Sequence, residues 1–75
     1  MIQLPFSCFI LLGGAWTKVW VTQSSWSTQV EYEDGCCIDP NIDPNTVNFD
    51  GRSLSYKLLP SGKLVTWPAR QAISV

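Results

Sequence analysis

A run of oxygen-bearing side chains in the middle of the chain has a spacing seen in calcium sites. Asp39, Asn41 and Asp43 match positions 1, 3 and 5 of an EF-hand loop, and Asp50 matches position 12. However, Pro44 stands where that loop requires glycine, and aspartate replaces the final glutamate. No helical pattern flanks the run. The sequence therefore excludes an EF-hand and leaves a weak site of loop oxygens as an alternative to ordinary turns.

The same residues belong to a tandem repeat, Ile-Asp-Pro-Asn at 38–41 and again at 42–45. Asp, Pro and Asn suit the first three positions of a type I turn. Two such tetrapeptides in series exclude a helix or a central strand, and they predict an irregular loop over 36–50. The polar residues of this loop that we consider as binding candidates are Asp39, Asn41, Asp43 and Asn45.

The chain contains few of the residue patterns that enzymes commonly use for catalysis. Histidine is absent, which removes the commonest general base and any Ser-His or Cys-His nucleophile within one chain. Glu31 and Glu33 would lie about 7 Å apart on one strand face, but beside a turn rather than in a cleft. Cys36 and Cys37 lack the two-residue gap of a zinc site. We therefore predict a protein that is not an enzyme and that has no metal or cofactor.

The three cysteines do not form a disulfide framework. Cys8 could pair with Cys36 or with Cys37, and the sequence leaves both pairings and three free thiols open. Free thiols suit a reducing compartment or a virus-like assembly. We therefore favour an intracellular or virion location, with secretion as the alternative.

The tryptophans are the best candidates for binding. Trp16 and Trp20 share a strand face with Lys18, and Trp26 follows in the next apolar segment. If exposed, such side chains form a protein interface or a sugar-stacking platform, and if buried they are core. We expect a protein partner or self-assembly, and carbohydrate is the weaker alternative. The candidate interface residues are Trp16, Lys18, Trp20 and Trp26.

The elements that must position these residues are strands, because apolar residues recur mainly at every second position. Glycine-containing turns such as Gly13-Gly14 and Asp34-Gly35 separate the runs. The pattern predicts strands over 6–12, 15–23, 26–33, 53–59 and 63–67, and a short edge strand over 72–75.

Two local expectations complete this picture. In the strand over 26–33, Trp26, Thr28, Val30 and Tyr32 share one face. Pro68 should end the strand over 63–67, because proline cannot donate to a sheet ladder, and one helical turn fits residues 68–73. The resulting prediction is an all-β fold, a small antiparallel barrel or sandwich of five to six short strands with one irregular loop.

The chain's 75 residues predict one small domain over 1–75, in which the loop 36–50 separates a strand group over 2–33 from a hairpin over 53–67. Only 15% of the residues are charged and 45% are hydrophobic, so part of the apolar surface should meet a partner. The basic residues are scattered, which argues against nucleic acid. The apolar segment Leu4–Leu12 is shorter than the ~20 residues that span a bilayer, so we predict no membrane span.

These features predict a non-catalytic structural protein, a small β subunit that packs into a larger assembly. A virus or phage particle would be a natural place for such a subunit. One alternative is a monomeric module that engages a protein or a carbohydrate through exposed tryptophans. The other is a small secreted protein with a retained signal-like N-terminus, because Leu4–Leu12 also resembles the core of a signal peptide.

Overall fold

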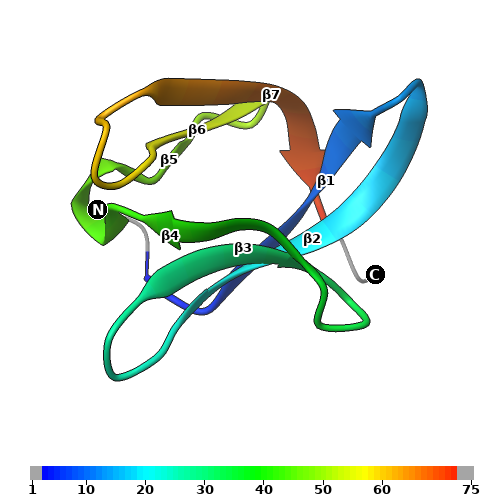
Figure 1. Cartoon of the computed structure of the whole chain (residues 1–75). Coiled ribbons are helices and arrows are strands. Elements are labelled where there is room, and N and C mark those ends of the chain that lie inside the picture. The colour runs from blue at the N-terminus through cyan, green and yellow to red at the C-terminus, as the bar shows by residue number, and fades with distance from the viewer. Residues whose placement is uncertain (1–2, 73–75) are drawn as a thin grey trace.

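The computed structural model describes residues 3–72, which form seven antiparallel strands and one short 3₁₀ turn (Figure 1). The strands are β1 (Phe6–Leu12), β2 (Ala15–Gln23), β3 (Thr28–Tyr32), β4 (Cys37–Ile42), β5 (Asn48–Phe49), β6 (Ser53–Lys57) and β7 (Leu64–Gln71), with the 3₁₀ turn η1 (Pro44–Thr46) between β4 and β5. They follow the order β4-β3-β2-β1-β7-β6-β5 in one sheet that does not close into a barrel. The all-β antiparallel class is confirmed, and the strand count was underestimated.

The hairpin of β1 and β2 has the bounds that the sequence predicts. Leu12 pairs with Ala15, so Gly13 and Gly14 alone make the turn, and both have positive φ, 58° and 82°. Such a two-residue turn needs residues that tolerate the left-handed region, and glycine does so without strain. The hairpin register fixes the two faces of β2: Val19 and Val21 are buried, and the alternate residues face outward.

β7 joins the two halves of the sheet. Its first residues pair with β6 as far as Pro68, and Ala69 to Gln71 pair with β1. The prediction that Pro68 ends the strand is therefore wrong, and so is the helical turn over 68–73. Proline ends only the pairing with β6, and the extended chain then continues along β1. Figure 1 shows β7 bending as it passes from one group of strands to the other.

The prediction of an irregular loop over 36–50 is wrong for its first repeat, which lies in β4. β4 is an edge strand, so Pro40 costs the sheet no internal hydrogen bond, and its pairing with β3 is interrupted by register shifts. The second repeat does form a turn. There Asp43 accepts a hydrogen bond from the backbone N–H of Asn45 at 3.0 Å, and η1 follows.

The core lies between the two groups of strands. β1 to β4 contribute Cys8, Ile10, Val19, Val21, Val30 and Ile42, and the C-terminal part contributes Val47, Leu54, Tyr56 and Ala69. Near one corner the two groups also meet through backbone contacts, an isolated bridge between Ile42 and Leu58 and a 3.0 Å bond from Leu59 N–H to the Asn41 carbonyl. Residues 3–72 contain no helix that is long and apolar enough to cross a membrane.

The remaining strand boundaries differ from the sequence pattern at their ends. β3 begins at Thr28, so Thr28 and Val30 are buried as expected but Trp26 lies before the strand and is 91% exposed. The strand predicted over 53–59 ends at Lys57. Residues 73–75, most of the edge strand predicted over 72–75, lie outside the described residues. The described structure leaves all three cysteines free.

Candidate functional site

The outward side of the central strands carries a row of aromatic and charged side chains. Phe9 on β1 is paired with Lys18 on β2 and with Arg70 on β7. We call this surface the outer aromatic face, and it consists of Phe9, Trp16, Lys18, Trp20, Glu33 and Arg70. The alternation of β2 places Trp16, Lys18 and Trp20 on the same side. The sequence prediction that these three share a face agrees with the burial of the intervening Val19.

Each tryptophan of this face has a cation beside it. The Arg70 guanidinium carbon lies 4.1 Å from the centroid of the Trp16 ring, and the Lys18 ammonium lies 5.2 Å from that of Trp20. Both distances are in the range of cation–π attraction. Trp16 is nevertheless 40% exposed. The face therefore offers apolar ring surface whose orientation is already fixed by neighbouring side chains.

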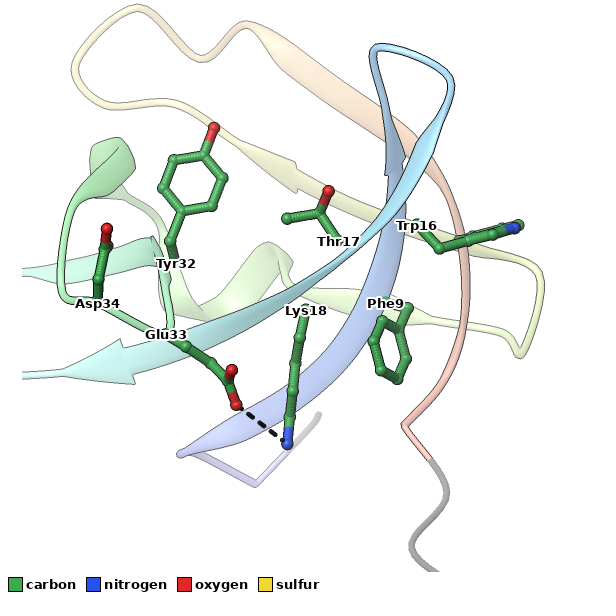
Figure 2. A pocket seen from close by; sticks show the side chains of 7 residues that line it. All are labelled: Phe9, Trp16, Thr17, Lys18, Tyr32, Glu33 and Asp34. Carbon is green, nitrogen blue, oxygen red and sulfur yellow. Dashed lines mark ion pairs between the residues drawn. The ribbon is translucent and has the colours of Figure 1, made fainter.

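An open hollow lies beside this face, and its lining takes side chains from both sides of β2 (Figure 2). Its lining residues are Phe9, Trp16, Thr17, Lys18, Tyr32, Glu33 and Asp34. In Figure 2, Asp34 and Glu33 lie at one end, Trp16 at the other, and Lys18 and Phe9 between them. The Lys18 ammonium forms a 3.5 Å ion pair with Oε1 of Glu33. The hollow thus has a lysine and an aromatic ring in its middle and two carboxylates at one end.

Trp26, another predicted interface residue, belongs to a different surface. It lies between β2 and β3, where it lines a second hollow together with Asn41, Pro44 and Leu59. Leu59 is 41% exposed, so this region also presents apolar surface. The structure therefore separates Trp26 from Trp16 and Trp20 rather than joining the three tryptophans in one site.

The polar candidates of the tandem repeat do not converge. Asp39 faces the protein interior, where its Oδ2 accepts a hydrogen bond from the Tyr56 hydroxyl at 2.5 Å. Asp43 caps the turn at Asn45, and Asn41 lies at the second hollow. Among residues 3–72, no group of three or more His, Cys, Asp or Glu side chains could hold a metal ion. Within the structure, the repeat thus contributes one turn and one long-range hydrogen bond.

Tyr56 is the centre of a partly buried polar network that the sequence did not reveal. Its hydroxyl oxygen accepts a 2.8 Å hydrogen bond from Nε1 of Trp67 while donating to Asp39. Burial raises the pKa of Tyr56 well above its usual value, and the bond to the Asp39 carboxylate raises it further. The hydroxyl is therefore held protonated, as a donor, and this network acts as a structural tie.

Three members of the outer aromatic face were missed by sequence reasoning: Phe9, Glu33 and Arg70. The sequence pattern includes Phe9 only in an apolar strand, and it predicts a helical turn at Arg70. Their adjacency depends on the pairing of β1 with β7, which joins distant parts of the chain. The alternation of Phe9 with the buried Cys8 and Ile10 is the signal that could have placed its ring outside.

Comparison with known proteins leaves the chain without a family assignment. No family model matches it, and neither a curated protein nor a solved structure matches it. The outer aromatic face and its hollow are therefore the basis on which a function is proposed.

Proposed function

We propose that this chain is a non-catalytic structural protein that packs into a larger protein assembly through the outer aromatic face. The supporting observation is the exposure of apolar side chains on the outer side of the β1–β2 hairpin, near its turn. Trp16 is 40% exposed and its cross-strand partner Leu11 is 36% exposed. Protein interfaces are enriched in aromatic residues and arginine, and their strongest contacts lie in a central apolar patch.

The charges of the face support the same proposal. Arg70 and Lys18 border the aromatic rings, and such charges give orientation to an apolar contact. The partners of this assembly are copies of the chain or other protein chains. A particle built from many small subunits, such as a virus or phage particle, is a suitable setting for a subunit of 75 residues.

A second candidate function is a monomeric binding module. The observation that favours it is Trp26, which is 91% exposed beside the second hollow. An exposed tryptophan next to polar groups such as Asn41 and Ser25 also suits stacking on a carbohydrate. In this alternative the outer aromatic face has no partner of its own.

Light scattering during size-exclusion chromatography separates the two candidates. The mass is measured at two protein concentrations that differ a hundredfold. We expect a multiple of 8.4 kDa at both concentrations. A monomer at both would contradict self-assembly, and would leave the binding module or a subunit that assembles with a different chain.

A further inference from the structure

We infer that the outer aromatic face binds a second copy of this chain across a two-fold axis. The inference rests on the proposed assembly function and supplies the partner that the function leaves open. The supporting observation is the order of charges across the face. Because opposite charges lie at its two ends, the face is complementary to a second copy of itself.

Four side chains of the face lie in one row across the sheet. Arg70 on β7, Phe9 on β1 and Lys18 on β2 are cross-strand neighbours, and Lys18 continues the row by its 3.5 Å ion pair with Glu33, just beyond β3. Adjacent strands are about 4.8 Å apart, so the row is about 14 Å long. It begins with a cation and ends with an anion.

The two ends of the row differ in how their charges are compensated. Among the described residues, no carboxylate lies within ion-pair distance of Arg70, whose guanidinium instead stacks on Trp16. Glu33 is paired with Lys18, but its side chain is 63% exposed, so a second cation can reach it. Asp34 adds a further negative charge at the same end of the hollow.

A two-fold axis between β1 and β2 places a second copy against the face of the first. The row of the second copy then runs in the opposite order to the row that it faces. Arg70 of one copy then meets Glu33 of the other, and the symmetry produces this ion pair twice. Phe9 of each copy meets Lys18 of the other, which allows two cation–π contacts in the centre. In a two-fold dimer the same patch is used by both partners, and a patch with opposite charges at its two ends meets that requirement.

A dimer of ordinary size would cover a small part of the surface of each chain. A standard interface covers about 800 Å² on each partner, which is about a sixth of the 4859 Å² that the chain exposes. In the proposed dimer this interface would include Trp16, Leu11 and Trp20 on the outer sides of β1 and β2. By contrast, a single-stranded nucleic acid needs a continuous track of cations, and Glu33 and Asp34 would repel its phosphates.

Sedimentation equilibrium of charge-reversed variants tests the inference. Arg70→Glu and Glu33→Arg each place like charges opposite each other twice, so we expect each to weaken dimerisation at least tenfold. An equimolar mixture of the two variants restores both complementary pairs, and it should dimerise like the original protein. Lys63→Glu serves as the control, because it makes an equal charge change in the exposed connection between β6 and β7.

Recovery of the dimer on mixing is the decisive result, because a folding defect in either variant could not produce it. If a multimer forms and neither charge reversal weakens it, this inference is wrong, although the proposed assembly function would still hold. A monomer at every concentration would overturn this inference and the self-assembly form of the proposed function, and would leave assembly with other protein chains or the binding module. The face would then belong to a different occupant, such as another protein chain, a sugar or a nucleic acid.

Discussion

The Tyr56 hydroxyl donates a hydrogen bond to Oδ2 of Asp39 at 2.5 Å, although the two residues are 17 positions apart in the sequence. Asp39 lies in β4 and Tyr56 in β6, strands that are not neighbours in the sheet order. With Trp67 donating from β7 at 2.8 Å, the tie joins the edge strand β4 to the opposite group of strands across the core. The repeat that suggested a calcium loop thus contributes a carboxylate to the interior.

Removing the Tyr56 hydroxyl should therefore destabilise the fold. Tyr56→Phe keeps the ring but leaves the Asp39 carboxylate and the Trp67 N–H without this partner, and we expect a loss of about 1–3 kcal/mol in the free energy of unfolding. Urea denaturation measures it. Tyr32→Phe is the matched control, because the Tyr32 hydroxyl makes no hydrogen bond within residues 3–72. Equal losses for the two variants would contradict the structural role of the tie.

The free energy of unfolding should fall in alkaline solution, because the folded chain buries the Cys8 thiol and the Tyr56 hydroxyl in their protonated forms. Burial raises the pKa of Cys8 from 9.0 to about 11, and the pKa of Tyr56 is raised from 10.0. The unfolded chain therefore loses these protons at lower pH than the folded chain does. The stabilisation that results from these two raised pKa values is complete below pH 9. It is lost as the pH rises through the pKa of each group in the folded chain.

The Cys8 part of this effect can be isolated by substitution. Thermal unfolding is followed between pH 8 and pH 11 for the original protein and for Cys8→Ala. The fall in stability should be smaller in the variant by about 2–3 kcal/mol, the value of a two-unit pKa difference. Cys37→Ala, which removes an exposed thiol, provides the comparison. A Cys8→Ala variant with an unchanged pH dependence would show that the buried thiol does not titrate in this way.

Deletion of residues 1–14 should abolish the fold. The deletion removes β1, which pairs with both β2 and β7 in the middle of the sheet order, and with it the buried Cys8 and Ile10. Circular dichroism and the dispersion of amide proton resonances would show the loss. A shortened chain that folds normally would instead favour the interpretation of this segment as a signal-like extension.

Two of the three thiols should react quickly with a thiol reagent, and the third should react slowly. Cys36 and Cys37 are exposed and Cys8 is buried, so an aromatic disulfide reagent should modify two thiols in the native protein and the third only on unfolding. A hydrogen bond to the Asp34 carboxylate, and then its charge, raise the pKa of Cys36. Asp34→Asn should therefore lower that pKa and speed the reaction of Cys36 at pH 8. Three equally fast thiols would contradict the burial of Cys8.

Local alternation was sufficient to predict the strands whose pairing is local. β1 and β2 follow from their apolar periodicity and from Gly13-Gly14, and the burial of Leu54 and Tyr56 agrees with the same rule. β4 escaped prediction because Pro40 and its turn-forming neighbours oppose a strand by propensity. An edge strand tolerates them, since one side of it has no ladder to maintain.

The candidate site was predictable only in part, for the same reason. Trp16, Lys18 and Trp20 share a face because they alternate along one strand, and that relation is visible in the sequence. Arg70 reaches the face because β7 leaves β6 and joins β1, which no local pattern encodes. Trp26 shows the opposite error, because alternation extended past the true start of β3 assigned it to a strand face that it does not occupy.

The pairing of β1 with β7 affects how the protein can fold while it is being synthesised on the ribosome. The hairpin of β1 and β2 is translated before β7, but one side of β1 has its partner in residues 69–71 of β7. Until β7 emerges, a strand destined for the centre of the sheet is an open edge with apolar side chains. The sheet can therefore be completed only after β7 has emerged, and in the interval the nascent hairpin exposes an edge that is prone to aggregation.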